Sequence, residues 1–131
     1  MAVWRRRALE LFPELRHEIQ GADSTPYSLF FELLPMARTA HETENIDLLR
    51  RIYTFAEWCM AQKAKDLWNS AGVCFYEHVF DWGKGQWPNV VPWLSPYVIH
   101  CCWTLWEARL EPPELERLRL VIERRTKHLY R

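Results

Sequence analysis

The sequence predicts an all-α protein of about six helices, arranged as antiparallel helical hairpins. Apolar residues recur at the three- and four-residue spacings of a helix along most of the chain, and no segment alternates apolar and polar residues long enough for a strand. Only 4 of the 131 residues are glycine. With 49% apolar and 26% charged residues, the chain has the composition of a soluble globular protein, and one domain over residues 1–131 is expected.

The first two helices are expected within residues 4–43. Helical spacing runs from residue 4 to residue 20, although Pro13 interrupts it. Thr25 followed by Pro26 predicts the next helix start, because a hydroxyl caps free N–H groups and proline at the first helical position loses no hydrogen bond. Pro35 lies inside this second pattern, so a kink or break is expected in the turn before it.

The third and fourth helices are expected within residues 45–80. Asn45 is a capping residue, and Asp47 falls in the first turn, where the helix dipole favours a negative charge. The turn QKAKD separates the two helices, and its Asp66 is the expected cap of the second. Glycines and prolines in residues 81–92 then predict a surface loop.

The last two helices are expected within residues 93–130. Ser95 and Pro96 repeat the hydroxyl-proline start, and the segment that follows to Leu110 is nearly apolar, which is typical of a central helix. Pro112 begins a final helix that ends near Tyr130 and has a strongly charged outer face.

These helices pair into hairpins over residues 4–43, 45–80 and 93–130. Each pair is close to the repeat length of armadillo and HEAT proteins, in which helical hairpins stack into an α-α superhelix. The pairs do not visibly repeat in sequence, so a compact helical bundle is the alternative. The charged last helix favours the stack, because such stacks need a polar end cap.

Composition and missing motifs exclude several classes of function. The longest apolar stretch, residues 97–106, is shorter than the roughly 18 to 20 residues that cross a bilayer, so no membrane role is expected. A formal net charge of zero argues against nucleic-acid binding. The N-terminal segment lacks the apolar region of a secretory signal, which predicts a cytoplasmic protein whose four cysteines are free, buried thiols. No phosphate-binding, dinucleotide-binding or zinc-protease motif occurs, so no cofactor is expected and catalysis is the less favoured interpretation.

Three segments resemble a family of small bacterial proteins of unknown function. They are STPYSLFFELLP, RRIYTFAEWCMAQKAKDLWNSAGVCFYEHVFD and VVPWLSPYV, the last followed by CWTLWEARL. The resemblance extends from about Leu11 to Leu110, and the long middle segment is its most specific part. It implies an all-helical fold in the style of armadillo-like superhelices. It brings no established activity, so no catalytic residue is carried over.

One cysteine and one histidine have the spacing of metal ligands. Cys74 and His78 are four residues apart and would share a helix face, and His100 with Cys101 or Cys102 would complete a four-ligand zinc site. The favoured alternative is that Cys74 is a small core residue and His78 a hydrogen-bonded boundary residue. No metal is therefore expected.

Three glutamates, Glu57, Glu77 and Glu107, stand beside aromatic residues. Two of them in one apolar cleft would raise a pKa and create a general acid. The favoured alternative is a buried hydrogen bond from an arginine or a tryptophan indole to a glutamate, which would hold helices in register.

Tryptophans also cluster in the expected loop. Trp82, Trp87 and Trp93 lie among its glycines and prolines, in a chain that is 15% aromatic. Such side chains either fold back over the core, which is the favoured alternative, or form an exposed patch that binds a partner.

The sequence therefore supports two hypotheses of function. The first is a non-enzymatic module that binds a protein or peptide in a groove between helix pairs, with the loop tryptophans and surface arginines as anchors. The second is a small-molecule or metal pocket, with enzymatic activity as one option. It would lie where Glu77, His78, His100 and Glu107 come together.

Overall fold

The computed structural model describes the backbone of residues 1–129 and the side chains of residues 1–125. Within that range it contains eight α-helices and four short 3-10 helices. The α-helices are α1 (Val3–Leu11), α2 (Arg16–Gln20), α3 (Pro26–Glu42), α4 (Ile46–Met60), α5 (Lys65–Cys74), α6 (Trp87–Val90), α7 (Pro96–Arg109) and α8 (Pro112–Leu129). The 3-10 helices are η1 (Pro13–Leu15), η2 (Tyr76–His78), η3 (Lys84–Gln86) and η4 (Val91–Trp93).

The all-α prediction is confirmed, but the structure has two more α-helices than expected. The additional helices, α2 and α6, are the shortest in the described chain. Phe12 leaves the helical conformation before Pro13, so the first expected helix is divided into α1, η1 and α2. The expected loop at residues 81–92 contains η3, α6 and the start of η4, because its prolines stand at the beginnings of short helices, where they are tolerated.

Three predicted caps are confirmed. The Thr25 hydroxyl accepts a hydrogen bond from the Ser28 N–H at 3.1 Å, and the Ser28 hydroxyl accepts one from the Thr25 N–H at 2.9 Å. Each of the two side chains thereby satisfies the backbone N–H group of the other residue. Asn45 and Ser95 each accept a hydrogen bond at 3.2 Å from the backbone N–H three residues later.

One local prediction was wrong and another holds only in part. Asp66 does not cap α5, which begins at Lys65 with Ala64 at the cap position, and Asp66 lies in the first turn. At Pro35 a kink or break was expected, and no break occurs, because α3 is continuous from Pro26 to Glu42. Pro35 cannot donate to the carbonyl of Phe31, but both residues are exposed, so that carbonyl is not confined to a dry core.

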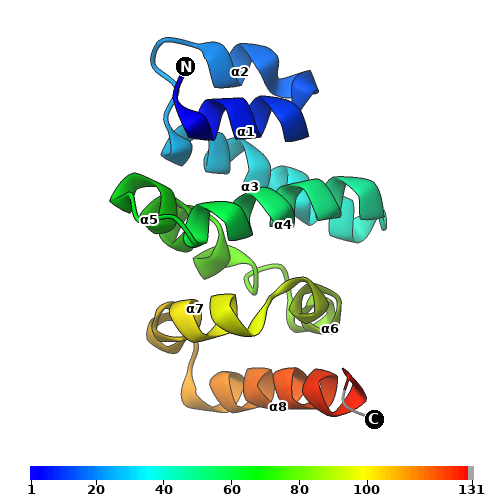
Figure 1. The fold of residues 1–131 in the computed structure, drawn as a ribbon. Helices are drawn as coiled ribbons and strands as arrows, with labels where there is room; N and C mark the ends of the chain where they lie inside the picture. The colour runs from blue at the N-terminus through cyan, green and yellow to red at the C-terminus, as the bar shows by residue number, and fades with distance from the viewer. Residues whose placement is uncertain (130–131) are drawn as a thin grey trace.

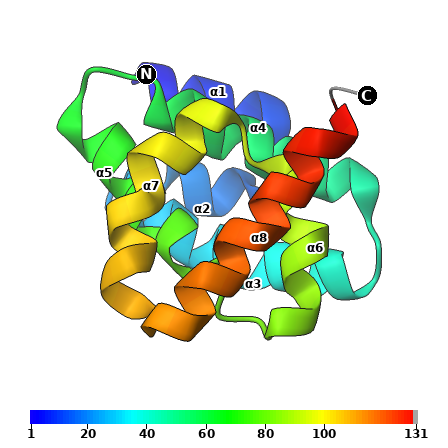
Figure 2. The same cartoon turned by 90° about the horizontal axis from the view of Figure 1, so that it is seen from below.

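The helices lie in successive layers, which Figure 1 shows from one end to the other. The layer of α1 and α2 packs on α3 and α4, and α3 packs against both α4 and α5. Below them lie α6 and α7, and α8 forms the opposite end. Seen from below, α8 runs obliquely with α7 on one side and α6 on the other (Figure 2), and it contacts both.

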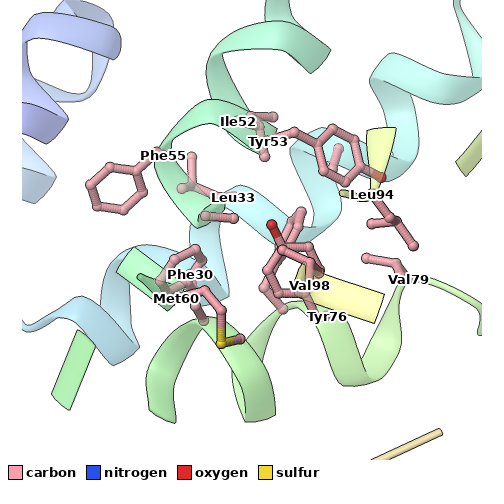
Figure 3. Close-up of a cluster of buried hydrophobic side chains, with 14 of the residues drawn as sticks. Phe30, Leu33, Ile52, Tyr53, Phe55, Met60, Tyr76, Val79, Leu94 and Val98 are labelled. Atoms are coloured by element: carbon pink, nitrogen blue, oxygen red, sulfur yellow. The ribbon is translucent and has the colours of Figure 1, made fainter. Parts of the chain in front are cut away.

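The buried side chains form one hydrophobic cluster, centred on α3 and α4. Figure 3 shows Phe30 and Leu33 of α3 facing Ile52, Tyr53 and Phe55 of α4. The same close-up places Met60, Tyr76, Val79, Leu94 and Val98 around them.

Helix α7 is less central than its apolar sequence predicts. Only Val98, Cys102 and Trp106 of this helix are buried, and these positions form a single stripe four residues apart. Tyr97 keeps 52% of its surface exposed, and Cys101 is exposed as well. The expectation failed because a nearly uniform apolar composition does not reveal which face packs inward.

Two buried tryptophans fasten the lower layers to the end of α5. The indole N–H of Trp106 donates to the carbonyl of Tyr76 at 2.8 Å, and that of Trp87 donates to the carbonyl of Phe80 at 2.9 Å. The Phe80 ring packs between them, with centroids 4.9 Å from Trp106 and 5.7 Å from Trp87. Both carbonyls lie beyond the end of α5, so the indoles satisfy groups that the helix does not.

Helix α8 is held by one arginine. The Arg125 guanidinium donates to the carbonyls of Val91 and Pro92 at 2.7 and 2.8 Å, and also to the carbonyl of Leu94. These carbonyls belong to η4 and its end, and among them Val91 also accepts a backbone hydrogen bond from the Leu94 N–H at 3.0 Å. Burial lowers the pKa of Arg125.

Removing the reciprocal cap at the start of α3 should weaken the fold. Replacing Thr25 by Ala should lower the free energy of unfolding by about 1 kcal/mol, because the Ser28 N–H loses its acceptor. Urea denaturation measures this change. Thr54→Ala, at an exposed position inside α4, is the matched control and should change stability by less than about 0.5 kcal/mol. Equal losses in the two variants would contradict the role of the cap.

Candidate functional site

A hollow of about 430 Å³ lies between α5 and α7 and is closed on a third side by the end of α4. Its lining comes from Trp68, Asn69, Gly72 and Val73 of α5, from Tyr97, Cys101, Cys102, Thr104 and Leu105 of α7, and from Met60 and Gln62. No Asp, Glu, Lys, Arg or His belongs to this set. Its volume falls in the range of about 300 to 1,000 Å³ typical of ligand sites. We call it the α5–α7 groove.

Two aromatic side chains stand exposed at the groove. Trp68 keeps 40% of its surface exposed and Tyr97 keeps 52%. Both are large apolar groups that the core does not use, and a partner would remove them from water.

The polar side chains of the groove are held in place by the surrounding structure. The Asn69 amide donates to the Tyr27 hydroxyl at 3.0 Å, and the Gln62 amide donates to the carbonyl of Trp58 at 3.0 Å. Fixed amides beside apolar walls can orient a ligand through their remaining hydrogen-bonding groups.

A second hollow, of about 310 Å³, lies between α2 and the start of α3. It carries the carboxylates of Glu18, Asp23 and Glu32 and no aromatic ring. An acidic surface of this kind is readily solvated, so the α5–α7 groove is the better candidate site.

The three loop tryptophans lie apart from the α5–α7 groove. Trp87 is 1% exposed and belongs to the core. Trp82 is half-buried with its ring centroid 5.5 Å from that of His41, and Trp93 stacks on Tyr53 at 5.5 Å and 10°. Each ring folds back onto the interior.

The polar residues predicted for a shared pocket are not all brought together. Glu77 and His78 are neighbours at 3.4 Å, and His78 also contacts Asp81 at 3.1 Å. Arg109 reaches the same Asp81 carboxylate at 2.6 Å, which ties the end of α7 to the segment after η2. This pair, 28 residues apart, has no local signal in the sequence.

The other two predicted members of that pocket, His100 and Glu107, are exposed on α7. Glu57, the remaining candidate glutamate, is exposed on α4. None of the three line the α5–α7 groove or the hollow beside α2. A hydrogen bond from a tryptophan indole to a glutamate was expected. The buried indoles of Trp87 and Trp106 instead donate to backbone carbonyls, so they need no acceptor side chain.

The expectation that Cys74 and His78 share one helix face was wrong. Cys74 is the last residue of α5 and His78 lies in η2, so the two do not share one helix face. Among the side chains described by the structure, no three His, Cys, Asp or Glu groups are placed to hold a metal ion.

All four cysteines are free, but they are not all buried. Cys59, Cys74 and Cys102 are buried as expected, whereas Cys101 is exposed at the α5–α7 groove. Burial raises the pKa of Cys59 and Cys74, and raises that of Cys102 to about 12. These three thiols therefore stay protonated at neutral pH and are poor nucleophiles.

The chain matches a family model described as Domain of unknown function (DUF7674) over residues 5–107. The chain therefore belongs to this family. The match includes α2 to α6, most of α1 and α7, and every residue that lines the α5–α7 groove, and α8 lies beyond it. No curated protein and no solved structure matches the chain. None of the helices within residues 1–129 is both long and apolar enough to span a bilayer.

A buried histidine links α3 and α4 to Trp82, which lies in the segment between η2 and η3. His41 of α3 is 6% exposed, and its Nε2 lies 2.8 Å from the Tyr53 hydroxyl. Its ring packs edge-on against Tyr53 and also contacts Trp82. Burial lowers the pKa of His41 to about 4, because the surrounding rings cannot solvate a charged imidazole.

The fold should therefore lose stability in mild acid. The folded pKa of His41 is about 4 and the unfolded value is 6.5, so below pH 6.5 the unfolded chain takes up a proton that the folded chain does not. The contribution of His41 to stability is complete above about pH 6.5 and is lost as the pH falls toward 4, by up to about 3 kcal/mol.

Urea denaturation at a series of pH values between 7 and 4 measures this loss. His41→Gln, which cannot ionise, should show a flatter pH dependence than the unsubstituted protein. His17→Gln, at an exposed position of α2, is the control and should leave the pH dependence unchanged. The same slope in all three proteins would show that His41 is not the group that titrates.

Proposed function

We propose that the protein is a non-enzymatic interaction module of the bacterial cytoplasm, which binds a peptide segment of a partner protein in the α5–α7 groove. We infer further that its layers are helical hairpins stacked in the armadillo or HEAT manner, with the groove between successive pairs. The observation that carries the proposal is the exposure of Trp68 and Tyr97 on either side of an uncharged hollow.

The groove has the composition of a binding hot spot. Tryptophan and tyrosine are enriched among the residues that dominate binding energy, and each can bury about 150 to 250 Å². Apolar side chains, including Met60, Val73 and Leu105, surround these two rings. A peptide side chain that enters would therefore exchange water for a largely apolar surface.

The titratable groups of the groove favour binding over catalysis. Its ionisable side chains are Tyr97, Cys101 and Cys102. The neighbouring Cys101 raises the pKa of Tyr97, and burial raises that of Cys102 to about 12. Neither Tyr97 nor Cys102 is therefore charged at neutral pH, and no carboxylate or imidazole lines the groove to act as a general base.

The proposed anchors differ from those suggested by the sequence. The loop tryptophans Trp82, Trp87 and Trp93 pack on the interior, where they support the fold. Trp68 and Tyr97 replace them as the proposed anchors. The proposed binding site is still a groove between helix pairs, as the sequence suggested.

Selection from a library of displayed peptides tests the proposal. The unsubstituted protein is the bait, and a Trp68→Ala, Tyr97→Ala double variant removes binders that do not use the groove. Both substitutions are at exposed positions, so the variant should fold. The expected result is a set of peptides with a shared motif that bind the protein at least tenfold more tightly than the double variant.

The matched control for this selection is Phe31→Ala, which removes an exposed aromatic ring, 68% exposed, from α3 outside the groove. It should bind the selected peptides as tightly as the unsubstituted protein. If no peptide distinguishes the protein from the double variant, the groove is not a peptide site.

A further inference from the structure

Gly72 forms part of the groove although the fold does not require glycine there. A Cβ added at this residue would lie 3.5 Å from Leu105 Cδ1 and 3.7 Å from Met60 Cε, which are ordinary van der Waals contacts. The residue is inside α5, and its backbone has no positive φ that would favour glycine. Alanine would suit the helix better. The missing side chain instead leaves the floor of the groove open.

The open floor lies beneath the exposed tryptophan. Trp68 precedes Gly72 by four residues and therefore stands on the same face of α5, one turn away. Across the groove, α7 presents Tyr97 and Leu105. An aromatic ring placed over Gly72 would lie one helical turn from Trp68 and next to the aliphatic groups of Leu105 and Met60. Tyr97 stands about two turns from Leu105 along α7, toward the other end of the groove.

Two lysines are near the groove in sequence, although neither lines it. Lys63 and Lys65 are exposed and belong to the turn between the groove residues Gln62 and Trp68. Neither belongs to any ion pair within the described part of the chain, and Asp66 is the only acidic side chain in this turn. An uncharged groove beside a turn with two lysines and one aspartate complements an apolar group flanked by carboxylates.

We propose that the α5–α7 groove holds an aromatic side chain of the partner peptide over Gly72, while acidic residues beside it in the peptide pair with Lys63 and Lys65. This assignment rests on the proposed function, because it names the chemistry of the peptide that the groove takes. Aromatic contact supplies the affinity, and the lysines select the flanking charge.

Blocked amino acids test the aromatic part of the assignment. N-acetyl-tryptophanamide, N-acetyl-phenylalaninamide and N-acetyl-alaninamide are titrated into ¹⁵N-labelled protein and followed by NMR. The two aromatic amides should cause saturable shifts in the amide resonances of Gly72 and Thr104, and the alanine amide should not. Equal shifts with all three amides would overturn the assignment.

Two pentapeptides test the flanking charge. One has tryptophan between pairs of aspartates and the other has it between pairs of lysines, both with blocked ends. The acidic peptide should bind at least threefold more tightly at low salt, and the difference should shrink as salt is added. Lys63→Gln with Lys65→Gln should remove most of the difference. Tighter binding of the basic peptide would overturn the role of the lysines.

Gly72→Ala separates binding from stability. The added methyl occupies the floor, so affinity for the acidic peptide should fall about tenfold or more. The same change should raise the melting temperature by a few degrees, because alanine suits the helix better and its Cβ meets no clash. Gly85→Ala is the matched control, since a Cβ there meets nothing within 4 Å, and it should bind like the unsubstituted protein.

Trp68→Ala is a second variant, which removes a wall instead of filling the floor. It should lose binding to a similar extent. Unchanged affinity in both Gly72→Ala and Trp68→Ala would overturn the assignment.

The outcomes also separate this assignment from the proposed function. Selected peptides that bind the groove but lack an aromatic residue would overturn the assignment and leave the peptide-binding function standing. If the aromatic amides bind at Gly72 while no displayed peptide uses the groove, the peptide-binding function fails and the site is one for a small aromatic molecule.

Discussion

The hydrogen bond from the Trp106 indole to the carbonyl of Tyr76 fixes the arrangement on which the rest of the structure depends. Helix α5 ends at Cys74, and the Tyr76 carbonyl beyond it accepts only a long backbone hydrogen bond, 3.4 Å from the Val79 N–H. Trp106 donates to the same carbonyl at 2.8 Å and thereby holds α7 beside α5. Trp87 does the same for Phe80 and holds α6. Helix α8 then attaches through Arg125 to the segment that these tryptophans have placed.

The same constraint defines the groove. Helix α7 uses the stripe of Val98, Cys102 and Trp106 to pack inward, and the neighbouring stripe of Tyr97, Cys101 and Leu105 is left facing α5. Both stripes belong to the same helix and repeat every four residues. Packing the first stripe inward therefore also sets the direction in which the second stripe points. The aromatic surface of the groove is therefore a consequence of how α7 is anchored. Because α7 is held rigidly, its side of the groove loses less conformational entropy when a ligand binds.

Three of the four predicted helix caps followed from the sequence, although Asp66 was assigned wrongly, and the long-range contacts did not. Thr25, Asn45 and Ser95 were found as caps because each signal lies within four residues of the backbone group that it serves. The sequence also suggested a groove between helix pairs. It could not identify the residues of that groove, because the role of Gly72 depends on Leu105 of another helix. The Asp81–Arg109 pair and the burial of Trp87 depend in the same way on residues distant in sequence.

The most direct test of the central hydrogen bond is the free energy of unfolding of Trp106→Phe, compared with that of Trp103→Phe, by urea denaturation. Trp103 is on the same helix and half-buried, and its indole donates no hydrogen bond to the described part of the chain. Trp106→Phe removes the indole donor, so the buried Tyr76 carbonyl keeps only the longer 3.4 Å hydrogen bond from the Val79 N–H. The substitution also removes buried ring atoms, so it should cost about 2 to 4 kcal/mol. Trp103→Phe should cost less than about 1 kcal/mol. Equal losses in the two variants would contradict the account.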